Sequence, residues 1–160
     1  MEKTPEREDK FNFIGPLGAN IAYFYTLASN PIELPDIEAA KAVPAIATTT
    51  NWFTEQALKE QGFTNLQSRT DPIDNLRMLV NKEADLAVFT DVTFPGLCEE
   101  AGVAADSLRP VLQLMQTEYY IAISKATAPE IVKQWEEAFA TIRENGTLES
   151  IRKKWFPASN

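Results

Sequence analysis

The chain has no histidine and a single cysteine among its 160 residues. Histidine is the usual general base of hydrolytic enzymes, the partner of serine and cysteine nucleophiles, and the commonest metal ligand. Cys98 alone can form neither an internal disulfide nor a thiolate metal site, and a buried, inert thiol is its expected state. These absences disfavour most hydrolytic enzymes, and no metal or other cofactor is expected.

The sequence also has no apolar run of the length that spans a bilayer. Charged and polar residues follow Met1, so no secretory signal is expected within this sequence. The net charge of −8 would repel phosphate groups, which argues against nucleic acid or an anionic membrane as a partner. Apolar residues make up 44% of the chain and include nine Phe, which is enough for a buried core.

Strand and helix signals alternate along the chain. Phe11–Phe13 reads as a short strand that Gly15 and Pro16 end, and Ile21–Ala28 reads as a second strand. Further strands are expected at Ala45–Thr50, Leu66–Ser68, Asp85–Phe89, Leu108–Leu114 and Tyr119–Ser124, with helices at Pro35–Ala42, Trp52–Gln61, after Asp71, and at Phe94–Ala101. This alternation with short loops predicts an α/β fold with a largely parallel sheet.

Several residues mark the ends of these helices. Asn51 is expected to cap the helix that begins near Trp52, and Gly62 stands where a left-handed C-terminal cap belongs. Asp71 followed by Pro72 is a helix start, because Asp caps free amides and Pro at the first position loses no hydrogen bond.

The C-terminal part of the chain predicts two helices with apolar faces. The residues expected to face inward are Ile131, Trp135, Phe139 and Ile142 on the first helix, and Leu148, Ile151 and Trp155 on the second.

Four sets of segments carry a resemblance to a known family. They are Thr4-Pro5-Glu6-Arg7 with Phe13-Ile14-Gly15-Pro16, Leu76-Arg77-Met78-Leu79 with Ala84 to Val88 and Asp91, Tyr120 to Lys125, and Gly146-Thr147-Leu148 through Phe156. In order and spacing the chain resembles the bacterial amino-acid-binding receptors of the ABC uptake type, which are the extracytoplasmic solute-binding proteins of family 3.

The resemblance implies a type II periplasmic-binding-protein-like α/β fold, in which two lobes joined by two crossing strands hold a ligand in a cleft. Residues 28–116 would form the complete second lobe. Residues 1–27 would supply a remnant of the first lobe and the first crossing strand, and residues 117–160 the return strand and C-terminal helices of the first lobe. The family's chains begin well before Thr4, so a complete second lobe and an incomplete first lobe are expected.

Two charged residues are assigned by resemblance to the ends of an amino-acid ligand. Arg7 would bind the carboxylate, which a guanidinium can meet with two parallel hydrogen bonds. Asp91 follows a buried strand at its carboxyl end, where open parallel sheets bind ligands, and would pair with the ammonium group. From the residues alone, a solvated Arg7 and an Asp91 that caps a helix or lies in a loop are the alternatives.

The segment Thr48–Phe53 also joins a strand to a helix, where exposed backbone amides attract anions. Other residues expected to contact the ligand are Thr49, Thr50, Asn51, Trp52, Phe53 and, from the crossing strands, Tyr120. The bulky Trp52 and Phe53 would narrow the pocket or wall it for an apolar or cyclic ligand. The alternative is that one of them belongs to the core. This segment and Asp91 are expected to face one shared cleft.

The resemblance favours a receptor that binds an amino acid or related carboxylate in the periplasm and delivers it to an ABC transporter permease. The alternative is a sensor or regulatory module of the same fold without a transport role. An enzyme is disfavoured, because a transglycosylase or dehydratase of related fold needs an acid–base pair in the cleft. Nothing in the sequence marks Glu99, Glu100 or Glu118 for that role.

An incomplete lobe would leave a sheet edge and aromatic side chains uncovered. The aromatic residues expected to border the gap are Phe11, Phe13, Tyr23, Phe24, Trp135, Phe139 and Trp155. A homodimer, in which the terminal segments pack against their copies or exchange between chains, would cover them. The alternative is that the first-lobe segments fold back on the second lobe.

Overall fold

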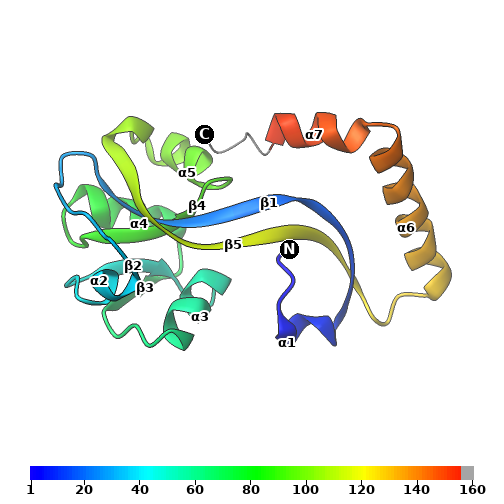
Figure 1. The fold of residues 1–160 in the computed structure, drawn as a ribbon, viewed down its shortest axis with the longest axis horizontal. Helices are drawn as coiled ribbons and strands as arrows, with labels where there is room; N and C mark the ends of the chain where they lie inside the picture. The colour runs from blue at the N-terminus through cyan, green and yellow to red at the C-terminus, as the bar shows by residue number, and fades with distance from the viewer. Residues whose placement is uncertain (156–160) are drawn as a thin grey trace. The chain divides into compact units, whose positions relative to one another are not determined.

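The computed structural model describes residues 1–155, without the side chains of Pro5 and Glu6. The chain divides into two units, of which unit 1 comprises Met1–Asn20 with Gln116–Asn160 and unit 2 comprises Ile21–Met115. Two long strands, β1 (Phe11–Leu27) and β5 (Leu108–Ser124), have residues in both units and are neighbours in the sheet, as Figure 1 shows. Within the described residues, no helix is both long and apolar enough to cross a membrane.

The sheet has five strands in the order β3-β2-β4-β1-β5. The remaining strands are β2 (Ile46–Thr49), β3 (Leu66–Arg69) and β4 (Leu86–Thr90). Strand β2 is parallel to both β3 and β4, whereas β4 is antiparallel to β1. The helices of unit 2 are α2 (Ile37–Lys41), α3 (Phe53–Glu60), α4 (Pro72–Val80) and α5 (Phe94–Ala101), with a 3₁₀ turn at Ala105–Ser107. The expected α/β fold is therefore present.

Local signals set two of the helix ends as expected. Asp71 caps α4, because its Oδ1 accepts a hydrogen bond from the Ile73 N–H at 2.9 Å. Gly62 follows α3 with φ 82°, and the next residue, Phe63, donates its N–H to the Leu58 carbonyl at 3.1 Å. Such left-handed geometry after a helix favours glycine. Both predictions are confirmed.

The expected break at Gly15 and Pro16 is wrong, because β1 continues from Phe11 to Leu27. Gly15 has φ 155°, and a Cβ at this position would lie 2.8 Å from Cδ1 of Tyr120. Glycine thus lets the Tyr120 ring of the neighbouring strand approach the backbone, and the strand passes the position instead of ending there. The two strands expected at 108–114 and 119–124 are likewise one strand, β5.

The core of unit 2 occupies both faces of the sheet. Ala87 and Phe89 of β4 point into one cluster with α4 and α5, while Leu86 and Val88 point into a second cluster with α2 and α3. This alternation follows from the period of two residues in a strand. Cys98 of α5 is buried in the first cluster, as expected, and burial raises the pKa of its thiol.

Unit 1 contains α1 (Pro5–Glu8), α6 (Pro129–Glu144) and α7 (Thr147–Trp155). Its buried apolar cluster is small and consists of Ile14, Phe139 and Leu148. The prediction that the whole apolar stripe of the two helices faces inward is wrong. The side chains of that stripe that are exposed are Ile131, Trp135, Ile151 and Trp155.

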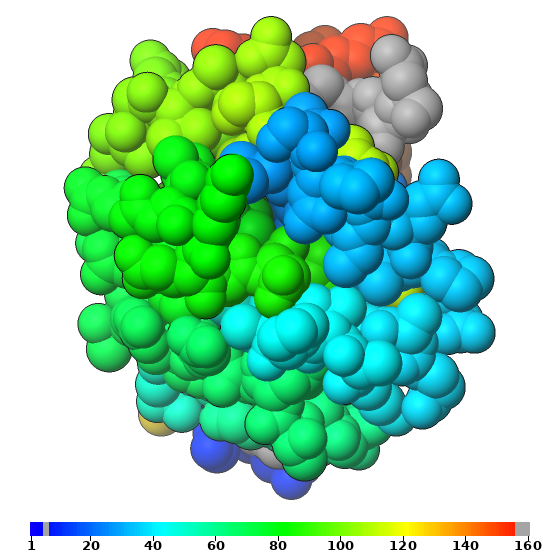
Figure 2. Space-filling model, turned by 90° about the vertical axis from the view of Figure 1, so that its left-hand side faces the viewer, coloured from blue at the N-terminus to red at the C-terminus, as the bar shows by residue number. Residues whose placement is uncertain are grey.

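Unit 2 has a hollow at the end of β1. It has a volume of about 240 Å³, and its lining includes Ser29, Asn30, Lys82 and Asp85. In Figure 2 the segment that follows β1 (blue) lies beside the segment that precedes β4 (green). Because Asp85 stands just before β4 and Asp91 just after it, the hollow lies at the opposite end of this strand from Asp91.

Candidate functional site

Two of the predicted ligand-binding segments meet one edge of the sheet in unit 2. Strands β2 and β4 are parallel neighbours, with Ile46 opposite Leu86 and Ala47 opposite Ala87. They end at Thr49 and Thr90, so the segment after β2 and Asp91 after β4 both follow carboxyl ends at the same edge. This edge is where open α/β sheets hold ligands.

Asp91 closes the ladder between β4 and β1. Its Oδ1 accepts a hydrogen bond from the Ile21 N–H at 2.9 Å, and its own N–H donates to the Ile21 carbonyl at 2.9 Å. The side chain therefore extends the antiparallel pairing by one step past Thr90 and is fixed in place by backbone.

The segment after β2 is held at its base by helix α4 and by the neighbouring strand β3. Thr49 is buried, and its Oγ1 accepts a hydrogen bond from Asn75 Nδ2 of α4 at 2.9 Å. The Thr50 N–H donates to the Arg69 carbonyl of β3 at 2.8 Å. Beyond this base, the side chain of Trp52 is 38% exposed. The segment is therefore fixed by hydrogen bonds at Thr49 and Thr50 and exposes an aromatic side chain at Trp52.

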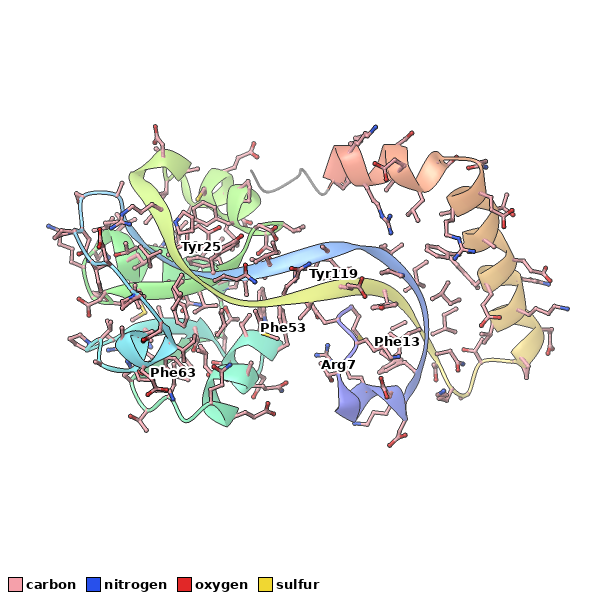
Figure 3. All side chains as sticks on the ribbon, in the orientation of Figure 1. Arg7, Phe13, Tyr25, Phe53, Phe63 and Tyr119 are labelled. Atoms are coloured by element: carbon pink, nitrogen blue, oxygen red, sulfur yellow. The ribbon has the colours of Figure 1, made fainter. Side chains whose placement is uncertain are left out.

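Asn51 does not cap α3, and that prediction is wrong. The N-cap is Trp52, whose side chain makes no capping hydrogen bond, and α3 starts at Phe53, labelled in Figure 3. Asn51 instead has φ 62°, a left-handed conformation that asparagine tolerates better than most residues. Its N–H donates to Oε2 of Glu55 at 2.8 Å.

Glu55 is a functional candidate that the sequence reading missed. Its side chain is only 1% exposed, and its Oε1 accepts a hydrogen bond from Ser68 Oγ of β3. Oε2 accepts from the Asn51 N–H and forms an ion pair with Lys59 at 2.9 Å. The signal was available, because Glu55 stands three residues after the N-cap, where Glu commonly accepts from free amides.

The stability contributed by Glu55 is expected to depend on pH. Burial by itself raises the pKa of Glu55, but hydrogen bonds from Ser68 and from the Asn51 N–H, together with Lys59, outweigh burial and lower the pKa below its ordinary 4.5. A carboxyl whose pKa is lower in the folded state stabilises the fold above the unfolded-state pKa. That contribution is lost as pH falls through the folded-state pKa.

We therefore expect Glu55→Gln to lower the free energy of unfolding near neutral pH, with a deficit that shrinks below pH 4.5. Urea unfolding of the wild type and the variant, from neutral pH to about pH 3, measures the difference. Glu60→Gln on the exposed side of the same helix serves as the charge-matched control. A deficit that stays constant over this range would show that the charge of Glu55 is not stabilising.

Arg7 and Tyr120 belong to unit 1, whereas the residues after β2 and β4 belong to unit 2. Arg7 Nη1 donates to the Glu2 carbonyl at 3.1 Å and lies 3.4 Å from Oε2 of the same residue. The Met1–Glu2 segment also pairs with β5, because the Tyr120 N–H donates to the Met1 carbonyl at 2.9 Å. Arg7 is therefore joined to Tyr120 through this N-terminal segment; Figure 3 labels Arg7, which lies in α1.

The polar groups of Arg7 and Tyr120 both bind residues close to them in sequence, Glu2 and Glu118. Tyr120 Oη donates to Oε2 of Glu118 at 2.7 Å, and this hydrogen bond, more than burial, raises the pKa of the phenol. The Tyr120 ring meets the edge of Phe13 with centroids 5.9 Å apart.

Among the residues that the structure describes, no group of three or more Cys, Asp or Glu side chains could hold a metal ion.

Comparison with known families gives one clear match. The family described as bacterial extracellular solute-binding proteins, family 3, matches residues 1–158. No protein of curated function matches this sequence.

Three solved structures are similar in fold and low in sequence identity. A histidine kinase sensor domain with similarity to periplasmic binding proteins is 23% identical, with a TM-score of 0.84 over 98% of this chain and 68% of that chain. The GluR0 ligand-binding core from Nostoc punctiforme, in complex with L-glutamate, is 23% identical, with a TM-score of 0.77 over 99% and 71%. ArtJ, the arginine-, lysine-, histidine-binding protein from Geobacillus stearothermophilus, is 14% identical, with a TM-score of 0.78 over 100% and 68%.

Proposed function

The chain belongs to the bacterial extracellular solute-binding proteins, family 3, with the type II periplasmic-binding-protein fold, and from this we propose that it binds a small amino acid or related carboxylate. It spans about two thirds of the length of the similar solved structures, as one lobe plus part of another. We propose that unit 2 corresponds to the complete lobe of residues 28–116. Unit 1 then corresponds to the incomplete lobe.

The observation that carries this proposal is the common sheet edge after β2 and β4. Asp91, fixed there by Ile21, takes the ligand ammonium group, and the segment Thr49–Phe53 supplies hydroxyl, amide and aromatic contacts. Arg7 takes the ligand carboxylate, and Tyr120 adds a polar contact. Opposite charges at the two ends of an amino acid would be matched by an acidic and a basic side chain.

Delivery of the ligand to an ABC transporter permease in the periplasm is the role that family membership favours. A sensor role without transport is the second candidate. The observation in its favour is the fold-level likeness to a histidine kinase sensor domain, with a TM-score of 0.84. Co-purification with an ABC transporter permease in the presence of the ligand separates the two roles, because only the transport role requires that contact.

We propose a binding role rather than catalysis. A general acid needs a carboxyl whose pKa is raised by burial or by a like charge. The carboxylates considered from the sequence, Glu99, Glu100 and Glu118, are all exposed. Glu118 also accepts a hydrogen bond from Tyr120.

Isothermal calorimetry with L-arginine, L-lysine, L-histidine and L-glutamate tests the proposed function. Saturable binding of at least one of them is expected. Agmatine, which is arginine without its carboxylate, is the matched ligand control and should bind far more weakly than L-arginine if Arg7 grips the carboxylate. The absence of saturable heat with all four amino acids would contradict the proposal.

We also propose that the chain forms a homodimer through unit 1, by packing or exchange of its terminal segments. Trp135 is 50% exposed and Trp155 is 62% exposed, and burial of such aromatic side chains drives association. Phe24 and Phe139 are not part of this surface, because both are buried, which corrects the expectation for them. Light scattering should give a mass of twice the 17.9 kDa chain for the wild type. Trp135→Glu should lower the measured mass toward that of a single chain. A monomer mass for the wild type at micromolar concentration would contradict the dimer.

A further inference from the structure

Glu55 is a buried carboxylate directly behind the segment that follows β2. Burying a charge is costly unless hydrogen bonds replace the lost water. Here Ser68 Oγ donates to Oε1, while the Asn51 N–H donates to Oε2 at 2.8 Å and Lys59 Nζ lies 2.9 Å from the same oxygen. The side chain is 1% exposed, so it has no surface with which to meet a ligand.

The bond to Asn51 holds a residue in an uncommon backbone conformation. Asn51 has φ 62°, a region that few non-glycine residues occupy, although asparagine tolerates it better than most. The neighbouring Thr50 N–H is held by the Arg69 carbonyl, and the Trp52 N–H by the Thr49 carbonyl at 3.2 Å. The carboxylate of Glu55 supplies the acceptor for the amide between these two.

The location of this bond connects it to the proposed ligand site. Asn51 lies in the segment that leaves the carboxyl edge of β2, next to Trp52, which is 38% exposed. Loss of the Glu55 acceptor would leave the Asn51 N–H without its partner and would free the segment to leave the left-handed turn. The exposed residues of the segment would then lose their fixed position.

We propose that Glu55 is a positioning residue, which holds Thr50–Trp52 in the conformation required for ligand binding by accepting the hydrogen bond from the Asn51 N–H. This inference rests on the proposed function of the segment as part of an amino-acid site. It assigns a role in binding to a side chain that touches no ligand.

Three variants of the full chain separate this role from a general effect on stability. Glu55→Met removes both acceptor oxygens at similar length, whereas Glu55→Gln keeps one oxygen for the Asn51 N–H. Glu60→Met makes the same replacement at an exposed position of α3 and is the matched control. Calorimetry with L-arginine, L-lysine, L-histidine and L-glutamate should show affinity reduced roughly 10- to 100-fold in Glu55→Met, as for the loss of a hydrogen bond to a charged group. The affinities of Glu55→Gln and Glu60→Met should stay within roughly threefold of the wild type, because the Asn51 N–H keeps an acceptor in both variants.

Amide hydrogen exchange, measured by NMR without ligand, reads the position of the segment directly. In Glu55→Met, exchange at Asn51 should accelerate at least roughly tenfold more than exchange at the buried Ala47 in β2, which reports the loss of overall stability. A variant that is merely less stable would accelerate both amides together. If Glu55→Met does not fold, Glu55→Ala replaces it, with the same expected outcomes.

The two measurements keep failure of the inference distinct from failure of the proposed function. Should the wild type bind none of the four amino acids while Asn51 exchange responds as expected, the proposed function fails and the hold of Glu55 on the segment stands. Unchanged Asn51 exchange in Glu55→Met would overturn the inference, as would fast exchange with unchanged affinity. Equal loss of affinity in Glu55→Gln and Glu55→Met would assign the effect to charge and overturn the hydrogen-bond mechanism.

Discussion

Replacement of Phe24 by alanine is expected to lower the free energy of unfolding of unit 2 by about 3–5 kcal/mol, the usual range for a buried Phe. Phe24 is fully buried in β1 and pairs with Val88 of β4 across the ladder. Its ring stacks on that of Phe63 with centroids 6.0 Å apart, in the cluster that joins the sheet to α2 and α3. Truncation removes both the buried ring and that contact, and it leaves a cavity between elements that cannot close fully.

Urea unfolding followed by circular dichroism measures this loss. Val80→Ala is the control, because Val80 is an apolar side chain of the same unit that is 41% exposed, and it should change the free energy of unfolding by about 0.5 kcal/mol or less. Phe24→Leu should fall between the two, since it refills part of the space. A loss below about 1 kcal/mol for Phe24→Ala would mean that the ring is not in the closed core assigned to it.

Unit 2 was predictable from the sequence because its signals are local. Asp71 with Pro72 begins α4, and Gly62 ends α3, each through hydrogen bonds to residues within a few positions along the chain. The buried strand before Asp91 was visible as a short apolar run, Leu86–Phe89, and every residue of β4 is buried. Where neighbouring residues decide the structure, sequence patterns are sufficient to read it.

The continuity of β1 was not predictable from its own residues, because Gly15 and Pro16 are ordinary break signals. The close approach of the Tyr120 ring to Gly15 involves a residue more than a hundred positions away in sequence. The exposure of α6 was missed for a related reason. Apolar spacing shows which face of a helix avoids water, but not whether another segment covers it, and Trp135 is 50% exposed.

The candidate site was predicted in outline and missed in its support. Strand ends followed by helix starts indicated Asp91 and the segment after β2, and the parallel register of β2 and β4 places both at one edge. With Asn51 as the helix cap, Glu55 would be the fourth helical residue, where no capping contact is expected. The cap lies one residue later, which moves Glu55 to the third helical position, where it accepts from the Asn51 N–H.

Replacement of Arg7 by alanine is expected to weaken amino-acid binding by about 2–4 kcal/mol, as for truncation of one partner of a desolvated charge pair. A guanidinium presents two parallel N–H groups to a carboxylate, and alanine leaves that carboxylate unpaired. The ion pair of Arg7 with Glu2 is long, at 3.4 Å, and it lies within the N-terminal segment, so its loss is expected to cost less stability than affinity. The expected result is therefore a large loss of affinity with little change in the melting temperature.

Calorimetry and thermal unfolding of the same variants test this pair of expectations. Arg7→Lys keeps the charge but not the fork, and should bind with affinity between those of the wild type and Arg7→Ala. Glu2→Gln removes the present partner of Arg7 without removing the guanidinium, so ligand affinity should hold or rise. Two outcomes would contradict the role of Arg7: Arg7→Ala that binds as tightly as the wild type, or Glu2→Gln that loses as much affinity as Arg7→Ala. In either case Arg7 would stabilise the N-terminal segment through Glu2, and another group would bind the carboxylate of the ligand.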